Sequence, residues 1–266
     1  MPEAPEVKRF VEAISKFVGD NSTINTLEVI SGRYVKEDIP GSAELRSILP
    51  LKIKEVCCKG KFIYWRFEGT DLVLFNTLGM SGSWNPHPRK HERVRIQTSS
   101  GNLHFNDPRN FGTLKVANEE ALQEKLNSLG PDVLNIAFDI FEFMKRIKKK
   151  PRLTLAEAIM DQSTIAGVGN YLKSDSLWLA KLSPHRVVAT CSDAELMQLS
   201  LCARRCALSS YESGGSTILT YRGFDDKEGT NRFLVYSQEE DPDGREVISE
   251  RTLDGRTSWW VPGHQV

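Results

Sequence analysis

The sequence lacks the cysteine pattern of a disulfide scaffold or of a four-cysteine metal site. Its five cysteines are an odd number, and no two of them have the Cys-x-x-Cys spacing of a zinc ligand pair. An odd set without a regular framework argues against a secreted, disulfide-bonded protein. Cys202 and Cys206 lie four residues apart in an expected helix, and we interpret them as small core residues. We therefore expect no metal and no cofactor.

Long apolar runs are also missing. No stretch approaches the roughly 18 apolar residues that a membrane-spanning helix needs. The first eight residues are already charged, where a secretory signal would carry an apolar core. These absences predict an intracellular protein that is not secreted and does not contact a membrane.

A basic excess, common in nucleic-acid-binding proteins, is absent too. Lys and Arg number 35 and Asp and Glu number 35, so the formal net charge is zero. The charges are unevenly placed, however, because residues 145–152 contain six cations and no anion. Local patches set the field that a phosphate backbone meets. This run is interpreted as a hinge between domains, with a solvated linker and a nuclear-localisation patch as alternatives.

What the sequence does contain changes in character near residue 117. The region before it starts with helical apolar spacing over 7–18 and continues as short runs rich in β-branched and aromatic residues. Seven such runs predict a β-sandwich: 26–30, 53–57, 62–67, 72–77, 94–98, 103–106 and 113–116. The region after it predicts helices over 121–129, 138–149, 155–160, 169–180 and 193–210.

Strand-like runs return at the C-terminal end, over 233–237, 246–251 and 256–261. Asp-Gly pairs between them are turn signals, so this part predicts a small β-hairpin. The fold class is therefore α+β. Residues 211–232 are rich in Gly and Ser, which favours a loop that covers a pocket.

The first motif with chemical meaning is Pro2 followed by Glu3. A small second residue permits removal of Met1, which would leave Pro2 as a secondary amine. An α-amino group has a pKa near 8, so part of it is neutral at physiological pH and able to attack a sugar C1′. The resulting iminium is an electron sink that promotes elimination. Glu3 would stand beside it to transfer protons at the ring oxygen or the leaving base.

Two further motifs are suited to phosphate and to DNA bases. Gly167-Val-Gly-Asn170 precedes an expected helix, where glycines and unpaired N–H groups allow close approach of a phosphate. The loop 106–112 presents Arg109 and Phe111 at its tip, and Met80 has a similarly suitable apolar shape. Such side chains can fill the space left by an extruded base.

Two cations complete the set. Lys61 stands at the start of an expected strand, where it is placed to bind phosphate or to assist proton transfer. Arg256 follows an Asp-Gly turn, and its planar guanidinium suits a phosphate. Each motif alone is also found in unrelated proteins, but all five occur in one order along this chain.

Together these residues resemble the formamidopyrimidine-DNA glycosylase/endonuclease VIII family. That family begins Pro-Glu-x-Pro-Glu, which is matched by Pro2, Glu3, Pro5 and Glu6. The resemblance implies catalytic roles for Pro2, Glu3, Glu6 and Lys61. It implies DNA-binding roles for Lys90, His91, Asn170 and Arg256, and void-filling roles for Met80, Arg109 and Phe111.

The resemblance also implies a domain order. It places an N-terminal catalytic β-sandwich at 1–120, a helical helix-two-turn-helix domain at 121–232 and a β-hairpin finger at 233–266. The family finger usually holds zinc through four cysteines. Here the last pair aligns with Val261 and His264 and the first pair falls near 241–244, so the resemblance implies a zincless finger. Trp259 or Trp260, packed against Phe233 or Val235, would stabilise it together with Val247 and Ile248.

The implied function is a DNA glycosylase with AP lyase activity, acting in base excision repair as a monomer on damaged double- or single-stranded DNA, in the nucleus or the equivalent compartment. The segment 160–172 resembles the endonuclease VIII branch, and Ser163 stands where the purine-acting branch tends to have lysine. This favours oxidised pyrimidines and ring-opened or further-oxidised purines. The Met80, Arg109 and Phe111 trio favours the alternative of 8-oxoguanine.

A second departure is Asn110, which stands where the family commonly has another arginine, so that one phosphate contact would be lost. Two hypotheses of other classes remain. A catalytically silent lesion-binding protein would not need Pro2, Glu3 and Lys61, which are all present. A helix-turn-helix regulator would leave the strand-rich first half without a role.

Overall fold

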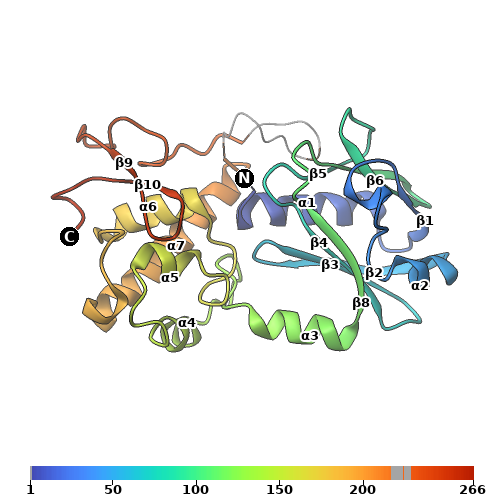
Figure 1. Cartoon of the computed structure of the whole chain (residues 1–266), viewed down its shortest axis with the longest axis horizontal. Helices are drawn as coiled ribbons and strands as arrows, with labels where there is room; N and C mark the ends of the chain where they lie inside the picture. Colours follow the sequence, from blue (N-terminus) through green and yellow to red (C-terminus); the bar gives the residue numbers. More distant parts are fainter. Residues whose placement is uncertain (1, 217–223, 225–228) are drawn as a thin grey trace. The chain divides into compact units, whose positions relative to one another are not determined.

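The computed structural model describes residues 2–216, 224 and 229–266, and the chain divides into two compact units. The described part of the first unit comprises residues 2, 6–127, 224 and 229, and the second comprises 3–5, 128–216 and 230–266. Figure 1 labels their elements. Within the described part of the chain no helix is long and apolar enough to span a membrane.

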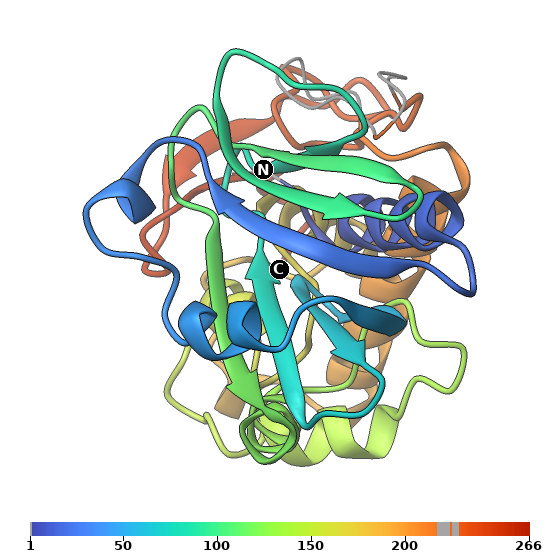
Figure 2. The same cartoon turned by 90° about the vertical axis from the view of Figure 1, so that its right-hand side faces the viewer.

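An antiparallel sheet of eight strands, in the order β5-β7-β6-β1-β2-β3-β4-β8, forms the first unit. Its strands are β1 (Thr23–Val29), β2 (Leu51–Lys59), β3 (Phe62–Phe67), β4 (Leu72–Thr77), β5 (Ser83–Asn85), β6 (Glu92–Thr98), β7 (Gly101–Asn106) and β8 (Thr113–Asn118). Only two residue pairs join β1 to β2, so the sheet folds there into two four-stranded layers. Figure 2 shows the strands of one layer crossing those of the other.

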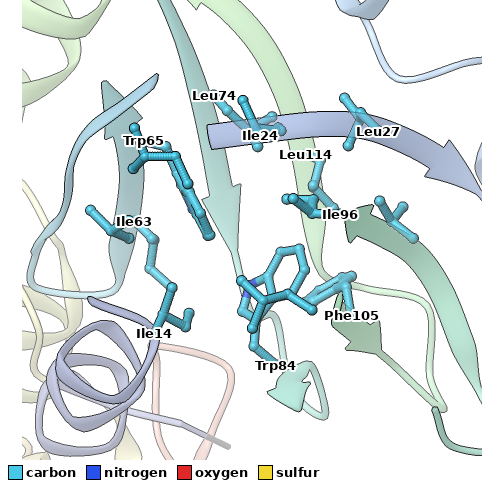
Figure 3. Packing of buried hydrophobic residues seen from close by; sticks show 14 of the residues in the cluster. Ile14, Ile24, Leu27, Ile63, Trp65, Leu74, Trp84, Ile96, Phe105 and Leu114 are labelled. Carbon is cyan, nitrogen blue, oxygen red and sulfur yellow. The ribbon is translucent and has the colours of Figure 1, made fainter. Parts of the chain in front are cut away.

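The hydrophobic core of this unit lies between the two layers. Trp65 of β3 and Trp84 of β5 are both fully buried, with ring centroids 6.0 Å apart. Figure 3 shows Ile14 of α1 (Ala4–Val18) beside the same cluster. The helical spacing of apolar residues over 7–18 therefore reflects a helix that covers the sandwich.

All seven strands predicted for the first unit are present, but a short strand, a short helix and a 3-10 turn were missed. Strand β5 has three residues, too few for an alternating pattern to be detected. Helix α2 (Ser42–Ser47) has six residues and buries Leu45 as its large apolar side chain. A 3-10 turn, η1 (Arg33–Val35), precedes it.

The second unit is helical. It contains α4 (Ile140–Ile147), α5 (Leu155–Met160), α6 (Asn170–Ala180), the 3-10 turn η2 (Val188–Thr190) and α7 (Asp193–Glu212), while α3 (Glu119–Ser128) lies almost wholly in the first unit. Capping boxes start α5 and α7: Thr154 pairs with Glu157, and Ser192 pairs with Glu195. These reciprocal bonds satisfy backbone donors at the helix starts, and the predicted helices are confirmed.

The C-terminal hairpin consists of β9 (Ile248–Arg251) and β10 (Thr257–Trp260). The strand predicted over 233–237 is wrong. The carboxylate of Asp175 accepts the N–H groups of Leu234, Val235 and Tyr236, each at 3.0 Å, so these donors converge on one side chain instead of alternating in a ladder.

Trp259 packs beside the buried Val235 and Val247, as expected. Ile248, which was also expected to contribute to this packing, is 41% exposed. Of the loop predicted over 211–232, residues 217–223 and 225–228 lie outside the described residues.

Candidate active site

The Glu3 side chain lies at the N-terminus of α6 within the second unit. Its Oε2 accepts hydrogen bonds from the N–H of Gly169 at 2.6 Å and of Leu172 at 3.3 Å, and its Oε1 accepts the N–H of Tyr171 at 2.9 Å. Donors in the first turn of a helix have no carbonyl partner within it, and the helix dipole attracts negative charge there. The helix start therefore fixes both carboxylate oxygens.

The residues on either side of Glu3 are also constrained. The Ala4 N–H donates to the carbonyl of Gly167 at 3.1 Å, and Gly167 has a φ of +104°, which favours glycine. Pro2, the predicted nucleophile, is buried and is joined by a peptide bond to the anchored Glu3. Glu6 is fully buried in the first turn of α1, in the first unit.

A residue missed by the sequence analysis supports this glycine loop. The Gln162 side chain accepts the Gly167 N–H at 2.9 Å and donates to the carbonyls of Met160 at 3.0 Å and Val168 at 2.9 Å. A glutamine just before a glycine-rich turn was the available signal, because one side-chain amide can satisfy several backbone groups of a loop.

Asn170 and the finger meet at the same end of α6. Asn170 is the first residue of the helix, and its Nδ2 donates to the carbonyl of Thr257 at 2.9 Å. Arg256, the neighbour of Thr257, is exposed. The structure thus brings two predicted phosphate-binding residues to one place, although Asn170 and Thr257 are 87 positions apart in the sequence.

Tyr236 is a second residue that the sequence analysis missed. Its ring centroid lies 4.5 Å from that of Trp259. Burial raises the pKa of the Tyr236 phenol, as does the charge of Glu3, whereas a hydrogen bond with Asn170 and the charge of Arg256 lower it. The phenol therefore belongs to the same polar group as Glu3, Asn170 and Arg256. Tyr236 was not identified from the sequence because residues 233–237 were wrongly predicted to form a strand.

In the first unit, the void-filling candidates lie on two loops that are bonded together. The Asp107 carboxylate accepts the Ser81 hydroxyl at 2.5 Å and the Gly112 N–H at 2.6 Å. The Arg109 N–H donates to the Ser81 hydroxyl at 3.1 Å. Asp107 therefore ties the loop that carries Met80 to the loop that carries Arg109 and Phe111.

The tip of these loops presents stacked cationic and aromatic groups. The Arg109 guanidinium carbon lies 4.8 Å from the centroid of the Phe111 ring, a cation–π distance. Phe111 is 52% exposed, which is unusual for a large aromatic residue that serves only packing. Met80, on the other loop, is half-buried.

The departure at Asn110 has a local explanation. Its φ is +56°, a left-handed conformation that Asn tolerates better than most residues. The Arg33 guanidinium donates to the carbonyls of Asn110 at 2.6 Å and Gly112 at 2.7 Å. An arginine from an earlier part of the chain thus supports this loop through its backbone.

The remaining predicted site residues, Lys61, His91 and Lys90, lie just before strands of the first unit. Lys61 is half-buried directly before β3, after Gly60 with its φ of +57°. His91 is half-buried directly before β6, and its carbonyl accepts the Asp107 N–H at 3.0 Å. Lys90 is exposed next to it. The backbone of His91 is therefore tied to the void-filling loops, whereas Lys61 lies at a different strand start.

The finger positions that align with the family's zinc ligands do not suit a metal ion. Asp241 accepts the Trp178 indole N–H at 3.0 Å and the Arg245 Nε at 2.8 Å. His264 Nδ1 lies 2.9 Å from the same guanidinium, and its Nε2 lies 3.2 Å from the Trp178 carbonyl. The Val261 side chain has no atom that could coordinate a metal ion. A guanidinium between the two candidate ligands would repel a cation, so these residues form a hydrogen-bonded network instead.

Comparison with known proteins covers most of the chain. Residues 1–114 match the model of the formamidopyrimidine-DNA glycosylase N-terminal domain, and residues 129–221 match that of the formamidopyrimidine-DNA glycosylase H2TH domain. The H2TH match contains the glycine loop and Asn170, and the N-terminal match contains all the predicted site residues of the first unit.

Relatives and solved structures agree with these matches. A formamidopyrimidine-DNA glycosylase of Thermus thermophilus is 32% identical over 98% of this chain and 97% of its own length. That of Oceanobacillus iheyensis is 30% identical over 83% and 80%. The crystal structure of the MutM (Fpg) protein from Thermus thermophilus superposes with a TM-score of 0.87 at 29% identity, covering 99% of this chain and 98% of that one.

Proposed function

The chain belongs to the formamidopyrimidine-DNA glycosylase family, and we propose that it excises oxidised bases from DNA through an iminium intermediate formed by Pro2. Membership makes it a base-excision-repair DNA glycosylase with AP lyase activity. It follows that the enzyme works in the compartment that holds the DNA. The observation that carries the proposed chemistry is the anchoring of Glu3, the residue next to Pro2, at the start of α6.

In the proposed reaction, the Pro2 nitrogen forms a bond with C1′ of the damaged nucleotide and gives up its own proton, while the glycosidic bond breaks and the base leaves with a proton. The nitrogen lone pair then opens the sugar, so that the C1′–O4′ bond breaks and O4′ takes a proton. Glu3 serves these proton transfers. The iminium withdraws electrons from C2′. Loss of a C2′ proton expels the 3′ phosphate and cleaves the strand.

Positioning of the nucleotide follows from the polar group at the end of α6. Asn170 and Arg256 would bind the phosphates that flank the extruded base. Lys61, His91 and Lys90 are proposed to contact DNA on the basis of the family resemblance. A planar guanidinium on a hairpin turn suits a phosphate. Met80, Arg109 and Phe111 would occupy the space that the base leaves in the stack, because their loops are tied together before any DNA binds.

The proposed substrates are ring-opened purines together with oxidised pyrimidines and further-oxidised purines. The endonuclease VIII-like segment 160–172 supports the pyrimidines. The relatives carry the name formamidopyrimidine-DNA glycosylase, which supports ring-opened purines. That name and the trio of Met80, Arg109 and Phe111 also support the second candidate, a preference for 8-oxoguanine.

A panel of duplexes, each with one lesion, tests this proposal. We expect the purified protein to release ring-opened purines and oxidised pyrimidines faster than 8-oxoguanine, and to nick the strand in the same reaction. Faster release of 8-oxoguanine would select the second candidate. Tight binding without release of any base would instead identify a catalytically silent lesion-binding protein. Single-stranded versions of the same oligonucleotides show whether a paired strand is needed.

A further inference from the structure

A fully buried ion pair joins α6 to the finger. The Lys173 Nζ lies 2.6 Å from Oδ2 of Asp254, and their side chains are 0% and 3% exposed. Lys173 lies on α6, one turn after Asn170, and Asp254 lies in the turn between β9 and β10. Both belong to the second unit. From the sequence, Asp254 was identified only as part of an Asp-Gly turn, and Lys173 was assigned no role.

Asp254 also organises the turn that presents Arg256. Its Oδ1 accepts the Thr252 hydroxyl at 2.6 Å and the Arg256 N–H at 3.1 Å. Gly255, between them, has a φ of +73° and thus permits the tight turn. The Asp254 carboxylate therefore contacts the ammonium of Lys173 with one oxygen and the backbone of Arg256 with the other.

The pKa shifts of Lys173 and Asp254 reflect both their burial and their pairing. Burial lowers the pKa of the Lys173 ammonium, while its hydrogen bond with Asp254 and the charges of Asp254 and Glu3 raise it. Burial raises the pKa of Asp254, but bonds from Lys173 and Thr252 bring it below its usual value. The pair thus lies close enough to Glu3 and Arg256 to experience their charges.

An ion pair of this kind is a poor source of stability. Removing two charges from water costs about as much as their attraction returns, and well-packed apolar residues often serve equally well. Its use is geometric, because an unpaired buried charge is so unfavourable that both partners must stay in register. Here the register sets where Arg256 stands relative to Asn170, whose side chain already binds the carbonyl of Thr257.

We propose that Lys173 is a positioning residue that acts through Asp254. It holds the finger turn against α6, so that Asn170 and Arg256 bind DNA phosphate as one preformed clamp. The inference rests on the proposed phosphate-binding role of Arg256. Without the pair the finger would still fold around Trp259 and Val235, but the guanidinium would have to be ordered when DNA binds, which reduces affinity.

The test compares the double variant K173M/D254N with the wild type and with R256A. The double variant removes both charges, while the carboxamide that replaces the Asp254 carboxylate can still accept the turn hydrogen bonds, so it avoids leaving one charge buried alone. We expect it to keep its Tm within a few degrees of the wild type. Its Kd for a duplex with a stable abasic analogue should rise about tenfold, and the dependence of log Kd on log salt should fall by about one unit.

The decisive measurement is a double-mutant cycle, in which the Kd for DNA is compared for K173M/D254N, for R256A and for the protein that carries both changes. If Lys173 acts by positioning Arg256, adding K173M/D254N to R256A should cause no further loss of affinity. Additive losses, or a double variant that binds like the wild type, would overturn the inference. Wild-type affinity in R256A alone would instead refute the proposed phosphate-binding role. The matched control is K52M, which removes an exposed lysine paired with Glu68 and should change neither Tm nor the DNA affinities measured in the cycle.

Amide hydrogen exchange tests the same inference on the wild-type protein and does not depend on the folding of any variant. The Arg256 N–H, bonded to Asp254 in a turn that the ion pair holds, should exchange with solvent at least about a hundredfold more slowly than an unprotected amide. Exchange at the rate of an open turn would show that the turn is not held and would also overturn the inference.

Discussion

At the scale of single residues, Glu3 is constrained by the helix that it caps. Three backbone N–H groups bind its two oxygens and fix the orientation of the carboxylate. A carboxylate held in this way loses little freedom when it meets the sugar, which favours proton transfer to one site. Tyr236 lies near enough to this carboxylate that the charge of Glu3 raises the pKa of its phenol, after burial as the larger cause.

Replacing Glu3 with Gln should separate the two activities. Base departure needs a proton donor, whereas elimination at a pre-formed base-free site needs less help, so excision should fall by about 10²–10⁴-fold while AP-site cleavage is largely kept. Single-turnover rates on a lesion duplex and on an AP-site duplex measure this split. The control is E12Q on the exposed face of α1, and equal loss of both activities would contradict the assigned role.

At the scale of elements, we propose that the finger folds without a metal ion. Asp241 and His264, which lie at or near the positions that align with zinc ligands, form a hydrogen-bonded network with Arg245 and Trp178. Beneath it, Trp259 packs with Val235, Val247 and Val261. Buried apolar area and hydrogen bonds between distant residues of the segment can thus supply the cross-links that a metal would provide.

The finger should therefore function without metal. We expect purified protein to contain well below one zinc per chain by elemental analysis, and dialysis against a chelator should leave AP-site cleavage unchanged. A structural zinc contributes folding energy directly, so stoichiometric zinc with loss of activity on chelation would refute this account of the finger.

The network also predicts a pH dependence. Burial raises the pKa of Asp241, but hydrogen bonds from Arg245, Trp178 and Asp243 together outweigh burial and lower it to about 2. Because the folded pKa lies below the usual 3.8, the stabilisation is present above about pH 4 and is lost as the pH falls toward 2. D241N should lower Tm by several degrees at pH 7, from a loss of about 2 kcal/mol. The difference in Tm between D241N and the wild type should become smaller below pH 4. A difference that stays constant with pH would contradict the stabilising role of the Asp241 carboxylate.

At the scale of the whole molecule, periodicity predicted the fold class, the seven longer strands and the helices, because each of these elements buries a continuous face. The structure added what depends on distant contacts. The backbone N–H groups of residues 234–236 all bind Asp175, and Lys173 pairs with Asp254. The partners are far apart in the sequence, so no local sequence pattern predicts these contacts. Tyr236 was missed for the same reason. Pro2 and Glu3 could be proposed from the sequence alone, because the chemistry proposed for them involves adjacent residues.

The central claim is that the Pro2 nitrogen is the nucleophile, and borohydride trapping on AP-site DNA tests it most directly. The protein with its N-terminal proline free should form a covalent adduct, and peptide mass spectrometry should place that adduct on Pro2. A chain with an N-terminal extension, in which the Pro2 nitrogen is an amide, should still bind the DNA but should not be trapped. Equal trapping of the extended chain, or an adduct on a lysine such as Lys61, would contradict the account.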